Sequence, residues 1–177
     1  MRKLMPAFFC AATFVLPALA HAEAVEAAPA GFLIVLQQEV HAKPADVFSD
    51  IGKVEKWWNK AHSWSGDAAN LSLSLTPDGC FCERWDGNAV VHGKVVFLRK
   101  NAQVVLQSSL GPLQALAVNG ILTFTMAPRD EGTILKLTYR VNGGPNSGLD
   151  KLAPVVDGVL AEQLHRLSAY AEKGAPE

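Results

Sequence analysis

The sequence predicts an α+β domain in which a long C-terminal helix covers one face of a curved antiparallel sheet. Three features carry this prediction. A β-branched and apolar run at 32–40 precedes a short helix. Between 71 and 141 the chain alternates apolar segments with turn residues, as a series of antiparallel strands requires. An amphipathic stretch then runs to about Glu172, with apolar residues recurring at helical spacing.

The short helix is expected to begin at Pro44. The N–H groups of the first helical turn have no acceptor within the helix, so the missing N–H of a proline costs no hydrogen bond there. Gly52 is expected to end it. In the next segment Leu71, Leu73 and Leu75 alternate with polar residues, which indicates a strand with one buried face. Further strands are predicted at 80–85, 90–100, 103–109, 120–126 and 133–141.

The C-terminal helix has a start signal of its own. Ser147, with Asp150 three residues later, is typical of a capping box. Pro154 is expected to kink the helix or to begin its main section. The apolar stripe of this helix is predicted to comprise Leu152, Val156, Val159, Gln163 and Leu167.

Residues 1–22 have the three parts of a cleavable secretory signal peptide. Two basic residues open the segment, an uncharged apolar stretch follows up to Ala20, and Ala20-His21-Ala22 offers small residues for cleavage before Glu23. We therefore expect export to the periplasm or secretion. The expected divisions of the chain are the signal peptide at 1–22, a short tether at 23–31, a folded domain at 32–172 and a tail at 173–177.

The composition excludes several function classes. Arg2 and Lys3 are among the 16 Lys and Arg residues, so cleavage leaves 14 against 17 Asp and Glu residues, a net charge near −3. No basic block occurs, and a nucleic-acid partner is therefore not expected. No membrane span is expected after cleavage. No glycine-rich nucleotide loop, HExxH or GxSxG motif occurs in the mature chain, so no cofactor is predicted.

Three motifs carry a family resemblance: GCFCERWDG at 79–87, LGPLQALAVNG at 110–120 and GLDKLAPVVDGVLAEQLHRL at 148–167. With this order of elements, the chain resembles the START/polyketide-cyclase superfamily (SRPBCC, the helix-grip fold), in a signal-bearing bacterial branch. The resemblance covers 32–172. It implies a curved antiparallel sheet gripping the long helix, with an apolar cavity between them. Because this fold hosts carriers, sensors and enzymes, the resemblance implies no particular chemistry.

Cys80 and Cys82 are the most unusual pair in the mature chain. Residues two apart in a strand lie about 6.6 Å apart on one face, whereas a disulfide prefers about 5.5–6 Å between Cα atoms and tolerates about 6.8 Å. Three interpretations stay open: two small buried hydrophobes, a structural or redox-active disulfide, and an incomplete metal site. No metal site is predicted.

Glu83 and His92 form a second candidate site. A two-residue hairpin loop at Asp86-Gly87 or Gly87-Asn88 would place both on one sheet face, either directly opposite or diagonally. If that face lines the cavity, the pair is a candidate catalytic acid/base or polar anchor. The alternative is an exposed ion pair on the outer face. A three-residue loop would instead set His92 beside Cys82, which would favour metal binding.

Aromatic and aliphatic residues on the predicted cavity walls are candidates for ligand contact. The tryptophans after the first helix either form the cavity mouth or fill the core, and Tyr139 shares the strand face of Leu137. The candidate ligand-binding residues are Trp58, Trp64, Phe81, Trp85, Leu137, Tyr139, Val156 and Val159.

The function predicted first is binding of a small hydrophobic or amphipathic molecule, or a lipid, in the cavity between the sheet and the C-terminal helix. A cyclase- or hydrolase-like enzyme using Glu83 and His92 is the alternative. A cochaperone that activates an ATPase is a third possibility, which export disfavours because ATP-driven partners are cytosolic.

Overall fold

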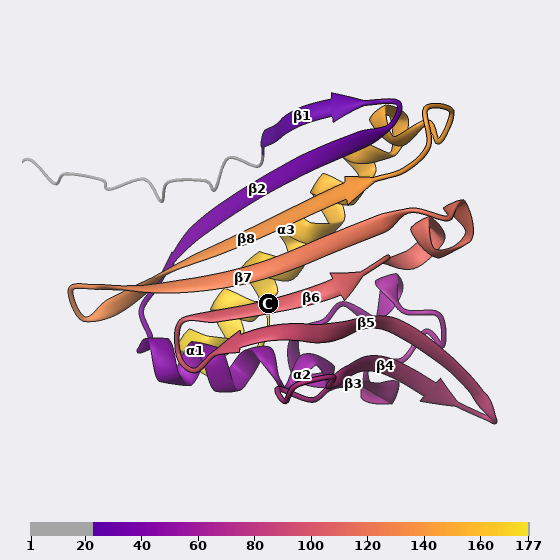
Figure 1. Ribbon diagram of the computed structural model, residues 1–177. Helices are drawn as coiled ribbons and strands as arrows, with labels where there is room; N and C mark the ends of the chain where they lie inside the picture. Colours follow the sequence, from indigo (N-terminus) through magenta and orange to yellow (C-terminus); the bar gives the residue numbers. More distant parts are fainter. Residues whose placement is uncertain (1–22, 177) are drawn as a thin grey trace, which may run out of the picture.

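The computed structural model describes residues 23–176 as one antiparallel sheet with a long helix packed across its inner face (Figure 1). The eight strands follow the order β1-β2-β8-β7-β6-β5-β4-β3. The α+β prediction is therefore confirmed. No helix in this described range is long and apolar enough to cross a membrane. The predicted signal peptide lies outside the described residues.

Apart from β1 and the short helix α2, the elements follow the predicted order. The strands are β1 (Glu23–Ala28), β2 (Gly31–Val40), β3 (Leu71–Leu73), β4 (Cys80–Trp85), β5 (Asn88–Arg99), β6 (Gln103–Ser108), β7 (Asn119–Arg129) and β8 (Gly132–Asn142). The helices are α1 (Pro44–Ile51), α2 (Val54–Trp57) and α3 (Leu149–Lys173), with short 3-10 turns η1 (Lys60–His62), η2 (Ala68–Asn70) and η3 (Gly111–Leu116).

The segment expected to be a tether is instead an edge strand. β1 pairs antiparallel with β2 from Glu23 opposite Val35 to Ala28 opposite Gly31. Its alanine-rich sequence has little strand propensity of its own. The strand forms because β2 offers it a complete row of backbone hydrogen-bonding groups, which the sequence pattern alone does not reveal.

The predicted capping box at the start of α3 is wrong. Gly148 occupies the position before the helix with φ of 66°, in the left-handed region, and no side chain caps the first turn. The backbone N–H of Leu149 instead donates to the Pro29 carbonyl at 3.1 Å, which ties the start of the helix to the β1–β2 turn. Pro154 lies within α3, which runs unbroken from Leu149 to Lys173.

Next to the edge strand β1, the part of the sheet from β2 through β8 to β7 is regular and filled. β2 pairs with β8 over ten residue pairs and β8 pairs with β7 over eleven, both without a register shift. The inner face here is packed against α3 through fully buried side chains. Among them are Ile34, Leu36, Leu122, Leu135, Leu137, Tyr139, Leu160 and Leu167.

The other end is irregular. The β4–β5 hairpin turns through Asp86 and Gly87, whose φ values of 43° and 79° suit a two-residue loop of the type I′ class. A register shift follows beside Phe81 and Cys82, and another interrupts β5 against β6 between Val95 and Phe97. Such bulges redirect side chains and often lie next to binding sites.

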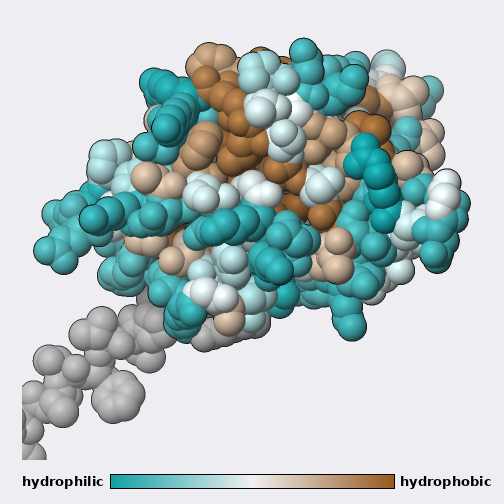
Figure 2. All heavy atoms as spheres, turned by 90° about the horizontal axis from the view of Figure 1, so that it is seen from below, coloured by the Kyte–Doolittle hydropathy of each residue, from teal (hydrophilic) through white to brown (hydrophobic). Residues whose placement is uncertain are grey.

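The surface is mostly polar with hydrophobic exceptions. Seen from the side of α1, α2 and β3, hydrophobic residues gather in one stretch bordered by hydrophilic ones (Figure 2). Two of the large exposed hydrophobic residues, Trp64 and Val155, also line the cavity described below. Among the residues whose burial is described, the large exposed hydrophobic ones are Trp64, Val91, Val96, Phe97, Leu116, Ile121 and Val155.

Candidate functional site

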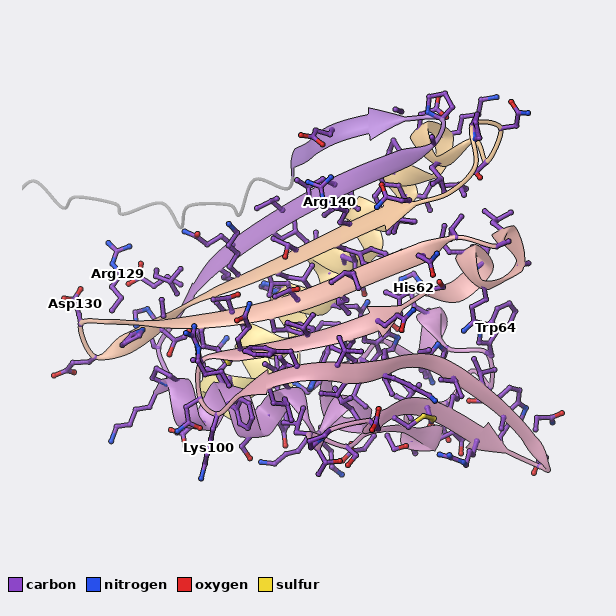
Figure 3. The ribbon with its side chains drawn as sticks, viewed as in Figure 1. His62, Trp64, Lys100, Arg129, Asp130 and Arg140 are labelled. Carbon is purple, nitrogen blue, oxygen red and sulfur yellow. A yellow bond between two sulfur atoms is a disulfide. The ribbon has the colours of Figure 1, made fainter. Side chains whose placement is uncertain are left out.

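A cavity of about 290 Å³ lies between β5, η3, the segment after α2 and the first half of α3. Its walls are aliphatic and aromatic except where His62, Ser63 and His92 reach them. Figure 3 shows His62 and Trp64 at the same end of the sheet as η3. The remaining lining residues are Trp58, Ala61, Trp64, Leu110, Gly111, Pro112, Leu113, Leu152, Val155, Val156, Val159 and Leu160.

Glu83 is a completely buried carboxyl group directly behind this cavity, with an exposed fraction of 0 %. It accepts three hydrogen bonds: the backbone N–H of Trp64 at 3.0 Å, the backbone N–H of Ser65 at 2.5 Å and His92 Nε2 at 3.0 Å. Burial raises the pKa of Glu83, but the hydrogen bonds from Ser65, Trp64 and His92 outweigh it and hold the pKa below its ordinary value. The carboxyl group is therefore ionised at neutral pH.

His92 lines the cavity and is 5 % exposed. It is the extra residue of the β5 bulge, because Val91 pairs with Cys82 while Gly93 pairs with Phe81. Its ring packs against Phe81 with centroids 4.9 Å apart. Burial lowers the pKa of His92, and the contact with Glu83 only partly opposes that shift, so the imidazole is neutral at pH 7.

The structure decides between the two placements of this pair. An exposed ion pair on the outer face was the alternative, and it is wrong, since both side chains are buried. The Asp86-Gly87 loop sets Glu83 opposite Val90 and diagonal to His92. The predicted shared face for Glu83 and His92 is confirmed by their 3.0 Å contact.

The segment Trp58–Ser65 forms one wall and is fixed at both ends. Near its start, the Asn59 backbone N–H donates to Gln163 Oε1 at 2.8 Å, and His62 Nε2 lies 3.0 Å from Glu162 Oε2. The Asn59 side chain also bonds Glu162, and this hydrogen bond is the largest cause that holds the pKa of Glu162 below its ordinary value. At the other end, Glu83 holds Trp64 and Ser65.

The two tryptophans in this wall differ in burial. Trp58 is buried, packs edge-on against Phe81 with centroids 5.4 Å apart, and donates from Nε1 to the His62 carbonyl at 3.0 Å. Trp64 is 54 % exposed and lines the cavity from the surface. Trp58 thus supports the wall, while Trp64 forms part of the mouth.

The predicted ligand-binding residues divide into four groups, the last of which, Leu137 and Tyr139, is described in the next paragraph. Those that line the cavity are Trp58, Trp64, Val156 and Val159. Phe81 lies one layer behind, against Trp58 and His92. Trp85 ends β4 and is not among the lining residues.

The prediction that Leu137 and Tyr139 line the cavity is wrong, because both lie in the filled end of the core. Tyr139 donates its hydroxyl to the Ser108 carbonyl at 3.1 Å and accepts from the Leu110 backbone N–H at 3.2 Å. Burial raises its pKa to about 12. Its hydroxyl is therefore a structural group that secures the approach to η3.

The sequence pattern did not predict the wall formed by η3. Leu110, Pro112 and Leu113 line the cavity from this turn. The only signal was the Gly111-Pro112 pair, which indicates a bend but says nothing about which way its leucines point.

Cys80 and Cys82 form a disulfide on β4 (Figure 3). Their Cα atoms lie 5.4 Å apart, closer than the spacing of about 6.6 Å in an extended strand. The strand is irregular at this point, beside the register shift with β5, and this brings the two residues within range. Among residues 23–176 no group of three or more His, Cys, Asp and Glu side chains is placed to hold a metal ion.

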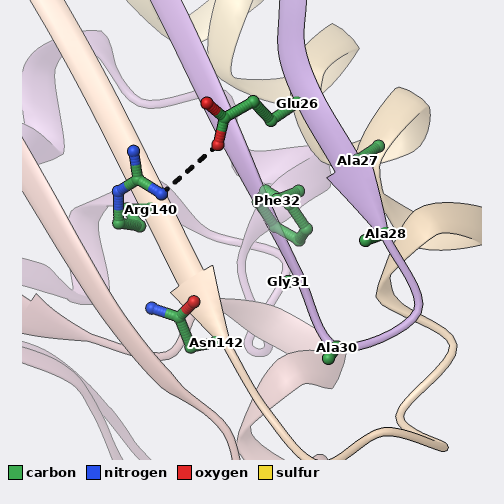
Figure 4. Close-up of a pocket in the computed structure, with 8 residues that line it drawn as sticks. All are labelled: Glu26, Ala27, Ala28, Ala30, Gly31, Phe32, Arg140 and Asn142. Carbon is green, nitrogen blue, oxygen red and sulfur yellow. Dashed lines mark ion pairs between the residues drawn. The ribbon is translucent and has the colours of Figure 1, made fainter.

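A second hollow, of about 440 Å³, lies over β1, β2 and the end of β8 (Figure 4). Alanine and glycine residues of the β1–β2 hairpin line it together with Phe32 and Asn142, and an ion pair of 3.5 Å joins Arg140 and Glu26 there. Both of these side chains are at least half exposed. The hollow therefore brings together no buried polar group that could do chemistry.

No protein-family model and no curated protein sequence matches the chain. Solved structures do match. CalU16 from Micromonospora echinospora has a TM-score of 0.56 at 14% identity, over 83% of this chain and 78% of its own. The Aha1 dimer structure from Colwellia psychrerythraea has a TM-score of 0.59 at 18% identity, over 80% and 97%.

A third match is the di-domain ARO/CYC StfQ of the steffimycin biosynthetic pathway, with a TM-score of 0.58 at 17% identity, over 81% of this chain and 51% of that one. The chain thus has the helix-grip fold. At these identities the likeness extends to the fold alone, so function must be argued from the cavity.

Proposed function

We propose that this protein binds a small hydrophobic or amphipathic molecule in the cavity between the sheet and α3. The observation that supports this most directly is a 290 Å³ space whose walls are almost entirely aliphatic and aromatic. Removing an apolar ligand from water is favourable by about 25 cal/mol for each Å² buried. A mainly apolar pocket with a few polar groups is typical of small-molecule sites.

The polar groups favour an amphipathic ligand over a pure hydrocarbon. His92 lies at the inner wall, and its partner Glu83 is buried behind it. His62 and Ser63 lie on the wall segment near Trp64. A ligand with one polar group and an apolar body would match this distribution.

Dye binding tests the proposal. We expect the purified protein to bind N-phenyl-1-naphthylamine saturably, with one site per chain and an increase in dye fluorescence. Val156→Trp would fill the cavity and weaken binding at least tenfold. Val96→Trp is the matched control, because Val96 is exposed on β5 and does not line the cavity. Absence of dye binding by the wild type, or equal losses in both variants, would overturn the proposal.

A second candidate is enzymatic proton transfer, supported by the buried contact between His92 and Glu83 at the cavity wall. Glu83 already accepts three hydrogen bonds, so His92 would be the proton acceptor and Glu83 a positioning residue. Hydrolysis of 4-nitrophenyl esters tests the hydrolase version. Turnover lost in His92→Phe, with dye affinity retained, would support catalysis. Turnover equal in wild type and His92→Phe would exclude it for this reaction.

We also propose that the protein is exported after cleavage before Glu23. The support is the sequence of residues 1–22, in which two basic residues and an uncharged apolar stretch precede small residues suited to cleavage before Glu23. Mass spectrometry of the periplasmic and extracellular fractions of an expressing bacterium tests this. We expect a chain that starts at Glu23. An uncut chain confined to the cytoplasm would contradict export and leave the binding proposal unaffected.

A further inference from the structure

The hydrogen bonds around Glu83 determine which nitrogen of His92 carries its proton. The N–H groups of Trp64 and Ser65 can only donate, and an ionised carboxylate can only accept. His92 Nε2 lies 3.0 Å from the same Oε2 that Trp64 reaches. Nε2 must therefore be the donor in that contact.

This leaves the other ring nitrogen as an acceptor. A neutral imidazole has one N–H and one lone pair, so protonation of Nε2 places the lone pair on Nδ1. Among residues 23–176, the hydrogen bonds of His92 involve Nε2 and the backbone carbonyl and leave Nδ1 without one, and Nδ1 is not among the enclosed unpaired side-chain atoms. Phe81 packs against the ring, and the ring also lines the cavity.

We propose that Nδ1 of His92 is the polar recognition point of the cavity and that the ligand carries a neutral hydroxyl, alcoholic or phenolic, on an apolar body. This inference rests on the proposed binding function and adds the chemical class of the ligand. A hydroxyl donates to Nδ1, and its attached carbon skeleton fills the space beside Val156, Val159 and Leu113.

Other polar groups fit less well. A carboxylate has no proton to donate to Nδ1. Only the imidazole ring of His92 would separate it from the buried negative charge of Glu83, which would repel it. An ammonium group could donate, but its desolvation against the aliphatic wall costs far more than that of a hydroxyl. The neutral donor is therefore the group that satisfies Nδ1 at the lowest cost.

A pair of isosteric probes tests the inference. 2-Naphthol and 2-methylnaphthalene share one skeleton and differ by a hydroxyl in place of a methyl group. We expect wild type to bind 2-naphthol about tenfold more tightly, since the methyl compound leaves a buried acceptor unpaired. Displacement of N-phenyl-1-naphthylamine measures both affinities. In His92→Phe the preference should disappear while 2-methylnaphthalene still binds.

Two controls keep the test interpretable. His165→Phe makes the same substitution at an exposed position on α3 and should keep the preference. If His92→Phe does not fold, His92→Leu replaces it, because leucine is smaller than phenylalanine and also carries no hydrogen-bond acceptor. The tautomer itself is read from the ¹⁵N NMR spectrum of His92, whose Nδ1 signal should move when 2-naphthol binds.

The outcomes separate the two proposals. If neither naphthalene nor the dye binds wild type, the binding function itself fails. If both naphthalenes bind wild type equally, or if the spectrum shows the proton on Nδ1, hydroxyl recognition is overturned while binding of apolar molecules stands.

Discussion

The two ends of the sheet use the same kind of strand for different purposes. From β2 through β8 to β7 the pairing has no register shift, and the inner face is filled by side chains such as Leu137 and Tyr139. From β6 through β5 to β4 the pairing shifts twice, a disulfide joins two residues that are two positions apart on β4, and a cavity remains. The shift between β4 and β5 therefore coincides with the buried polar pair, whereas the shift between β1 and β2 lies at the opposite edge of the sheet.

The difference shows how a fold separates stability from recognition. Regular pairing maximises backbone hydrogen bonds and lets α3 pack against a continuous apolar face. The bulge at His92 interrupts that regularity, and it places an imidazole on the inner face, between Phe81 and the cavity. Substitutions at the filled end should therefore mainly lower the free energy of unfolding, and substitutions at the cavity should mainly change ligand affinity.

The largest expected effect is at the filled end. Leu137→Ala removes a fully buried side chain and should lower the free energy of unfolding by about 3 kcal/mol. Val156→Ala removes a half-buried side chain that borders the cavity, so its cost should be below about 1 kcal/mol. Urea denaturation measures both. Dye affinity should change in Val156→Ala and stay constant in folded Leu137→Ala; the reverse pattern would contradict the division.

The next effect is at Glu83. Glu83→Gln should lower the free energy of unfolding by about 2 kcal/mol, because an amide N–H would then face the donor of Trp64 or Ser65. Glu162→Gln is the matched control on α3, where the carboxyl group is 40% exposed, and should cost below about 1 kcal/mol. Similar losses in both variants would show that Glu83 does not anchor the Trp64 segment.

Some of the structural features behind these predictions can be predicted from the sequence, and others cannot. The strand at 80–85 was predicted with the observed limits, because turn residues bound it on both sides. The face shared by Glu83 and His92 followed from strand parity. The bulge at His92 could not be predicted from parity. A bulge depends on how two strands pair, and the sequence pattern of a single strand does not show it.

The cavity was harder to predict than the sheet. Parity correctly assigned Leu137 and Tyr139 to the inner face, but both lie in its filled part. Which part of that face stays empty depends on where α3 and η3 cross it, and Gly148 and Gly111 set those paths through left-handed backbone conformations. The alanine-rich β1 was missed for a related reason, since only its pairing with β2 makes it a strand.

Removing the disulfide tests whether the structure of the irregular end depends on this covalent link. Replacing Cys80 and Cys82 by serine opens a very short loop, for which chain entropy predicts a loss of about 1.5 kcal/mol in the free energy of unfolding. We expect the ¹⁵N spectrum of His92 to stay unchanged, because the Asp86-Gly87 turn and the pairing of β3 with β4 hold the register independently. Loss of the His92–Glu83 contact in this variant would mean that the disulfide itself maintains the bulge.

The smallest expected effect is the pH dependence of stability. The pKa of His92 in the folded chain lies below its ordinary value of 6.5 because of burial, so on acidification the unfolded chain takes up a proton first. The free energy of unfolding should therefore fall as pH drops below about 6.5. The pKa values of Glu83 and Glu162 lie below the ordinary 4.5, so the free energy of unfolding should fall further below pH 4.5. Burial raises the pKa of Asp157, and this group partly opposes that fall. Denaturation midpoints between pH 8 and pH 4 measure this dependence.

In His92→Phe, only the fall in stability that begins near pH 6.5 should disappear. If that fall persists in His92→Phe, another group causes it, and the buried imidazole at the irregular end does not limit stability in that pH range.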